Sequence, residues 1–169
     1  MTDTVVQGHP ALTDPLTGLP NRLHFETVYR LVLRAVERGI PVSLAILEID
    51  GLEKHTLDRG RAGADELVRF VADRFRRISR GADLLARVEE GRFFLLLFDC
   101  NTHGARIAAD RFQDQLDSDE EPELSVSVGV ASSNREESYQ ADELISFAER
   151  ALAQAQSLGP RSVELYSPS

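Results

Sequence analysis

Helical and extended hydrophobic patterns alternate along this chain, and their order restricts the fold more than any other feature. Residues 42–49 form a nearly continuous apolar run, which is typical of a strand covered on both faces. Residues 83–86 and 93–98 are two further apolar runs, joined by a short segment with Gly91 near its end, and this pattern predicts a β-hairpin. Residues 124–130 alternate between apolar and small polar side chains, as a half-buried strand does. These segments predict the strands of one sheet.

Segments with helical periodicity lie between the predicted strands. Asn21 can cap a helix whose apolar side chains recur at helical spacing up to Val36, and residues 39–41 end it. Further helices are predicted at about residues 64–79, 102–116 and 141–157, and a last short strand at residues 162–166. The acidic loop at residues 117–123 is expected to be mobile. This order predicts a central five-stranded sheet flanked by helices, an α/β sandwich related to the split βαβ plan.

Composition limits the class of protein. A chain of 169 residues with 42% hydrophobic and 28% charged residues fits one globular domain, and we expect residues 1–12 to be a flexible N-terminal arm and residues 13–169 to be that domain. The net charge of −9 argues against general nucleic-acid binding. No apolar run approaches the ~18 residues needed to span a membrane. Residues 1–4 do not resemble the start of a signal peptide, and the single cysteine, Cys100, fits a reducing cytoplasm.

Several ordered motifs carry a family resemblance. Residues 14–22 resemble an Asp-x-Leu-Thr-Gly-Leu-x-Asn-Arg motif, residues 46–50 resemble a strand that ends in Asp-Ile-Asp, and residues 125–131 resemble a Val-Ser-x-Gly-Val-Ala strand. Residues 60–66 retain the Asp-Glu of a Gly-His-x-x-Gly-Asp-Glu stretch. With these motifs, nearly everything from residue 13 onward resembles the bacterial GGDEF (diguanylate cyclase) family. The resemblance implies a mostly antiparallel, palm-like, ferredoxin-related sheet and a role in cyclic di-GMP signalling. It does not imply activity, because function lies in the site rather than in the fold.

The hairpin turn departs from the family signature. The family's Gly-Gly-Asp/Glu-Glu-Phe falls on Glu89, Glu90, Gly91, Arg92 and a retained phenylalanine. Taken on its own, the segment is a solvated turn in which Gly91 supplies a positive φ. Against the family, the second metal carboxylate has become glycine, and two carboxylates stand where the glycine pair would approach phosphate.

The resemblance places the rest of the former substrate site on scattered positions. The family's first metal carboxylate falls on Glu48, its guanine-facing Asn on Thr56 and its guanine-facing Asp on Asp65. The triphosphate-binding Lys and Arg fall on Gln156 and Pro160, and Arg161, one residue further on, is a partial substitute. We therefore expect no cyclase activity, no catalytic residue, no required cofactor and no bound magnesium.

A second motif lies just before the hairpin. Arg80 and Asp83 have the Arg-x-x-Asp spacing of the product-binding inhibitory site in many GGDEF domains, and the family's further Arg on the next helix matches Arg111. An Arg fork can pair with phosphate or with the O6/N7 edge of guanine, and an Asp accepts hydrogen bonds from guanine's N1 and N2. The alternative is that Arg80 and Asp83 form only an exposed ion pair and that Arg111 is a solvated helix residue.

Three functions follow as hypotheses. The first is an inactive GGDEF domain that acts as a cyclic di-GMP receptor through Arg80, Asp83 and Arg111. The second is a ligand-independent module for a protein partner or for homodimerisation. The third, GTP binding without turnover, depends on Glu48 and Asp65 alone.

Overall fold

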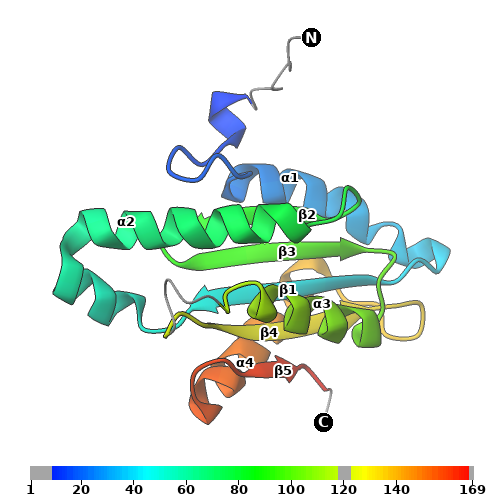
Figure 1. Ribbon diagram of the computed structural model, residues 1–169. Coiled ribbons are helices and arrows are strands. Elements are labelled where there is room, and N and C mark those ends of the chain that lie inside the picture. Colours follow the sequence, from blue (N-terminus) through cyan, green and yellow to red (C-terminus); the bar gives the residue numbers. More distant parts are fainter. Residues whose placement is uncertain (1–8, 118–122, 168–169) are drawn as a thin grey trace.

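The computed structural model describes residues 9–117 and 123–167 of the chain. The elements in these residues follow the predicted alternation (Figure 1). They are η1 (Pro10–Leu12), α1 (Arg22–Leu33), η2 (Val36–Arg38), β1 (Val42–Ile49), α2 (Leu52–Ile78), β2 (Leu84–Glu89), β3 (Arg92–Phe98), α3 (Thr102–Asp114), β4 (Val126–Ser133), α4 (Ala141–Leu158) and β5 (Val163–Leu165).

The strands form one five-stranded sheet in the order β2-β3-β1-β4-β5. Neighbouring strands are antiparallel except β4 and β5, which are parallel. The predicted fold class, a mostly antiparallel five-stranded sheet flanked by helices, is therefore confirmed.

The helices cover both faces of the sheet, with α2 and α3 on one face and α1 and α4 on the other (Figure 1). Because side chains alternate along a strand, β1 contributes to two cores. Ala45 and Leu47 pack under α2 and α3, whereas Leu44 and Ile46 pack with α1 and α4. This sandwich fixes the edge strand β2 and its hairpin with β3 against α2.

A glycine sets the distance between β4 and α4. A Cβ built at Gly129 would lie 2.1 Å from the backbone nitrogen of Leu152 and 2.3 Å from the carbonyl oxygen of Ala148. Any side chain here would push the helix away from the sheet. The glycine of the Ser-x-Gly-Val-Ala motif is thus a packing requirement.

Helix α2 differs from its prediction. It begins at Leu52 rather than near residue 64, and Gly60 interrupts it with φ 72° and ψ −179°, which produces the bend at the left of Figure 1. The sequence concealed the first part because Glu53, Lys54 and Asp58 leave little apolar periodicity there. The bend places this part beside the hairpin tip.

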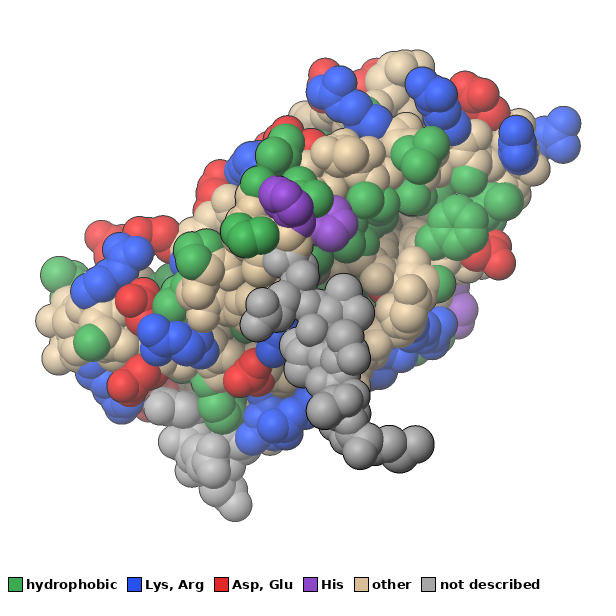
Figure 2. Space-filling view, turned by 90° about the horizontal axis from the view of Figure 1, so that it is seen from above, with side chains coloured by type: hydrophobic (Ala, Val, Ile, Leu, Met, Phe, Trp, Pro, Cys, Tyr) green, Lys and Arg blue, Asp and Glu red, His purple; other side chains and the backbone are tan. Residues whose placement is uncertain are grey.

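Two predicted irregular segments are only partly described. Within the expected arm, residues 10–12 form a short 3-10 helix, while residues 1–8 lie outside the described residues. Residues 118–122 of the acidic loop also lie outside them. No helix of the described part is both long and apolar enough to cross a bilayer. Figure 2 shows acidic and basic side chains interspersed on the upper face, with hydrophobic side chains between them.

Candidate functional site

The tip of the β2–β3 hairpin carries four of the residues assigned to the former substrate site. Glu89 lies opposite Arg92, so Glu90 and Gly91 form the turn. The prediction that Gly91 has a positive φ is wrong. Gly91 is buried, and a Cβ built there would lie 2.6 Å from Leu52 Cδ2. The glycine is needed because α2 packs directly against the turn.

An ion pair joins Glu48 on β1 to Arg92 on β3. The two residues are register partners in the sheet, and Arg92 Nε and Nη2 donate to Glu48 Oε2 at 2.9 and 2.6 Å. Partial burial opposes the charge of Arg92, but the hydrogen bond and the attraction of Glu48 outweigh it and raise the pKa of the guanidinium. Glu48, at the position of the family's first metal ligand, is therefore already bound to a cation of the chain itself.

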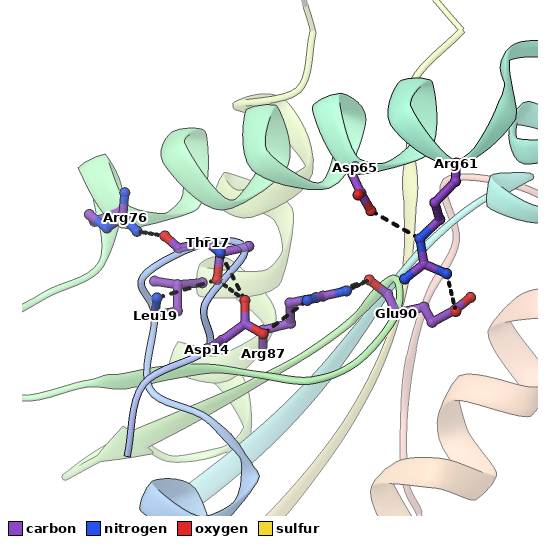
Figure 3. Close-up of polar contacts among 8 residues, drawn as sticks. All are labelled: Asp14, Thr17, Leu19, Arg61, Asp65, Arg76, Arg87 and Glu90. Atoms are coloured by element: carbon purple, nitrogen blue, oxygen red, sulfur yellow. Dashed lines mark hydrogen bonds and ion pairs between the residues drawn. The ribbon is translucent and has the colours of Figure 1, made fainter. Parts of the chain in front are cut away.

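The two turn carboxylates are also paired within the chain. Arg22 Nη2 on α1 donates to Glu89 Oε1 at 3.0 Å. Arg61 on α2 lies between Glu90 and Asp65, with its Nη1 3.1 Å from Glu90 Oε1 and its Nε 3.2 Å from Asp65 Oδ1 (Figure 3). The aspartate at the guanine-facing position thus contacts an arginine.

A cavity of about 410 Å³ persists at the hairpin tip. Six of the seven residues assigned to the former substrate site line it: Glu48, Thr56, Glu89, Glu90, Gly91 and Arg92. Asp65 lines a smaller cavity beside it together with Thr56. Thr56 Oγ1 donates to the carbonyl oxygen of Leu52 at 2.8 Å, so this hydroxyl is engaged with its own helix. The fold brings together the positions that the resemblance assigned to one site.

The expected phosphate-binding positions contribute no cation to this cavity. Gln156 and Pro160 are exposed, and neither lines it. Arg161 Nη2 instead donates to Asp117 Oδ2 at 2.8 Å and to Asp114 Oδ1 at 3.3 Å. Arg161 is therefore held by carboxylates of its own neighbourhood and does not line this cavity.

The donor set at the former metal position does not fit magnesium. Mg²⁺ requires oxygen ligands in near-octahedral geometry. Gly91 offers no side-chain oxygen, Arg92 is a cation, and its guanidinium is bound to Glu48. In residues 9–117 and 123–167, no group of three His, Cys, Asp or Glu side chains is placed to hold a metal ion.

A partly buried ion pair between Arg87 and Asp14 supports the hairpin tip, and the sequence analysis gave it no role. Arg87 Nη1 lies 2.9 Å from Asp14 Oδ1, and the two side chains are only 12% and 13% exposed. Arg87 Nε and Nη2 also donate to the carbonyl oxygen of Glu90, while Asp14 Oδ2 accepts from Thr17, whose carbonyl oxygen accepts from Arg76 (Figure 3). The signal was available, because an Asp opens the residue 14–22 motif and an Arg precedes the turn.

A second polar cluster lies beyond the C-terminal end of α2. The backbone nitrogen of Asp83 donates to the carbonyl oxygen of Arg80 at 3.0 Å. Burial raises the pKa of the Asp83 carboxyl, while a hydrogen bond that the carboxyl receives from the backbone of Arg80 and the charges of Arg80 and Arg111 act in the opposite direction. The three residues named from the sequence therefore lie within electrostatic reach of one another.

Three polar atoms of this cluster are buried and have no hydrogen-bond partner in the described structure: Asp83 Oδ2, Arg111 Nε and Arg111 Nη2. Of the two alternatives, the exposed Arg80–Asp83 ion pair is absent from the described residues, and Arg111 is not simply solvated, because part of its guanidinium is buried. Its guanidinium carbon lies 5.9 Å from the ring centre of Phe112.

The chain matches one protein-family model, described as diguanylate cyclase, GGDEF domain, over residues 11–162. Among curated relatives, the uncharacterised protein y4lL of Sinorhizobium fredii is 30% identical over 166 residues, which cover 95% of this chain and 20% of the relative. Diguanylate cyclase DosC of Escherichia coli is 28% identical over 172 residues, covering 97% of this chain and 37% of DosC. The chain thus spans well under half of these relatives.

Solved structures share the fold. The GGDEF domain of DgcB from Caulobacter crescentus, in complex with c-di-GMP, matches with a TM-score of 0.85 and 22% identity over 95% of this chain and 96% of that chain. The GGDEF domain of PA1120 (TpbB or YfiN) from Pseudomonas aeruginosa matches with a TM-score of 0.84 and 25% identity over 92% and 94%. Diguanylate cyclase SiaD of the same organism, in complex with its activator SiaC, matches with 0.82 and 24% over 92% and 62%.

Proposed function

The chain belongs to the diguanylate cyclase, GGDEF-domain family, and on this premise we propose that it is a catalytically inactive member that binds cyclic di-GMP through Arg80, Asp83 and Arg111. In this role it reports the concentration of the nucleotide and does not synthesise it.

The unpartnered atoms of Asp83 and Arg111 carry the proposal. A buried polar group without a partner costs about 1–3 kcal/mol, so the free protein holds these side chains at the expense of stability. Cyclic di-GMP offers matching partners. Its guanine N1 and N2 donate to a carboxylate, and its phosphates and the O6/N7 edge of guanine accept two parallel bonds from an Arg fork.

The former substrate cavity supports the loss of catalysis. Joining two GTP molecules requires metal ions and cations that stabilise the charge on the reacting phosphates. Here Arg92 binds Glu48, and exposed Glu89 and Glu90 face the space where the family holds phosphate. A carboxylate at ~4 Å from a phosphate oxygen costs roughly a few kcal/mol at an effective dielectric near 20. We propose that this chain requires no cofactor and does not hold magnesium at this position.

Two structural neighbours were solved with the two kinds of partner, a nucleotide and a protein. DgcB was crystallised with c-di-GMP, and SiaD with a protein activator. The alternative to a receptor is accordingly a module that binds a protein partner, or a second copy of this chain, whether or not cyclic di-GMP is bound.

Calorimetric titration with cyclic di-GMP tests the receptor role. We expect saturable binding with a Kd in about the micromolar range, weakened at least about tenfold by Arg80→Ala and by Arg111→Ala. The matched control is Arg106→Ala, which should leave the Kd within about twofold. Arg106 lies on α3, as Arg111 does, and its side chain is 45% exposed. Absence of binding at roughly tens of micromolar, or equal binding by all variants, would exclude the receptor role.

A separate assay tests catalysis. Incubation of the unmodified chain with GTP and either Mg²⁺ or Mn²⁺ should yield no cyclic di-GMP and no pyrophosphate. Turnover that scales with protein concentration would refute inactivity while leaving the binding proposal untouched.

A further inference from the structure

Part of the lining of the cavity at the hairpin tip is apolar, and this apolar surface continues outside the cavity. Ile49 and Leu52 line it, and so does Leu57, which is 81% exposed. Leu57 belongs to the first part of α2, which lies between Gly51 and Gly60, both with positive φ. A large aliphatic side chain held in water at the rim extends the apolar surface beyond the cavity itself. In Figure 2, hydrophobic, acidic and basic side chains lie close together at the left end, which this part of α2 forms.

The rim of this cavity is acidic. Glu48, Glu53, Glu89 and Glu90 line it against a single cation, Arg92. Three of these carboxylates already have an arginine partner, but Glu90 remains 76% exposed. Glu53 has no ion pair in the described part of the chain. A carboxylate offers about four acceptor positions, so the rim retains the capacity to bind donors.

We propose that this cavity docks a basic, aliphatic segment of a protein partner. A Lys or Arg of the segment lies among Glu53, Glu90 and the neighbouring carboxylates, and an adjacent aliphatic side chain packs on Leu52 and Leu57. An apolar centre surrounded by a polar rim is the usual anatomy of a protein interface. The carboxylates that exclude phosphate also select the charge of this partner.

The extent of the apolar surface favours a protein segment over a small cation. A volume of about 410 Å³ accommodates one or two side chains, and Leu57 projects past it. A free diamine or guanidine would fill the acidic rim and leave Leu57 in water. A protein segment covers both. The cavity and the Arg80 cluster lie at opposite ends of α2, so this docking holds whether or not cyclic di-GMP binds.

The test uses a defined probe, the peptide acetyl-Leu-Lys-Leu-Arg-Leu-amide, titrated into the ¹⁵N-labelled chain. We expect amide shifts confined to residues 48–57 and 89–92. Leu57→Ser and Glu53→Lys should each weaken binding about fivefold. The matched control, Leu31→Ser, removes an aliphatic side chain of similar exposure, 67%, on α1 and should change nothing.

Four results of these titrations would overturn the docking proposal. They are no shifts, shifts centred on other residues, equal binding of acetyl-Leu-Glu-Leu-Glu-Leu-amide, and equal binding of agmatine, which would mark a site for small cations. A concentration-dependent dimer that Leu57→Ser abolishes would assign the surface to a second copy of this chain, and would overturn it as well.

Discussion

Arg92 Nε and Nη2 both donate to Glu48 Oε2, at 2.9 and 2.6 Å, across neighbouring strands. The residue at the position of the family's first metal ligand is thereby bound by the guanidinium of the first residue of β3. Because the pair also links the start of β3 to β1, these two residues contribute to the stability of the fold. The pair therefore predicts a stability effect at residues that a cyclase would use for chemistry.

Replacement of Arg92 by Leu should lower the free energy of unfolding by about 1–2 kcal/mol, because it leaves a half-buried Glu48 without its cation. In the Glu48→Leu background the same change should cost less, since the unpaired charge is gone. Urea unfolding of the four proteins in this cycle measures both effects. Additive losses would show that the pair makes no net contribution.

Replacement of Asp83 by Asn should stabilise the free protein at neutral pH and weaken cyclic di-GMP binding. Burial raises the folded-state pKa of Asp83 above its unfolded value, so the folded state binds the proton more tightly. The free energy of unfolding therefore falls as the pH rises from the pKa of Asp83 in the unfolded chain to its higher pKa in the folded chain. Over this range the carboxyl ionises more readily in the unfolded chain. The stabilisation by Asp83→Asn should appear at pH values above both pKa values and vanish at pH values below both.

Urea unfolding of the wild type and Asp83→Asn across acidic and neutral pH measures this difference. Equal stability at every pH would mean that the orphaned carboxylate costs nothing. Stabilisation together with unchanged nucleotide affinity would separate Asp83 from the ligand site.

Replacement of Arg87 by Leu should lower the free energy of unfolding by about 3 kcal/mol, since it leaves the partly buried carboxylate of Asp14 without its cation and removes two donors to the turn. Arg87→Lys keeps the charge but loses the fork geometry, so its loss should be intermediate. Chemical denaturation measures both variants. If Arg87→Leu costs less free energy of unfolding than disruption of an exposed ion pair such as Arg106–Asp110, the Arg87–Asp14 pair does not stabilise the hairpin tip.

Replacement of Gly129 by Ala should destabilise the protein by about 1–3 kcal/mol, because the new Cβ would collide with the backbone of α4. The control is Gly81→Ala, where a Cβ would meet nothing within 4 Å, and it should stay within about 0.5 kcal/mol of the wild type. Thermal unfolding compares the two. Similar melting temperatures would show that α4 shifts freely.

The sequence predicted the sheet well because its strands carry strong local signals. The continuous apolar run of β1 and the paired runs of β2 and β3 leave little alternative. The start of α2 was missed, since its first part is polar and Gly60 breaks its periodicity. The conformation of Gly91 was wrong because close packing against Leu52, a tertiary contact, decides it.

The sequence predicted which positions form the candidate sites, but it did not predict which side chains contact one another there. Family register placed Glu48 and Arg92 in one site, but only the folded chain brings Arg22 and Arg61 to Glu89 and Glu90. Likewise, Arg80, Asp83 and Arg111 were named from the resemblance to the family's Arg-x-x-Asp site and its further Arg. That Asp83 and Arg111 hold buried atoms without partners depends on how α3 packs, which no local pattern encodes.

A crystal structure of the chain grown with cyclic di-GMP tests the central claim most directly. The account predicts the nucleotide beside Arg80, with Asp83 Oδ2 accepting from guanine and Arg111 Nε and Nη2 donating to the ligand, each at about 3 Å. Nucleotide bound instead in the cavity between Glu48 and Glu90, or bound elsewhere with those three atoms still unpartnered, would contradict it.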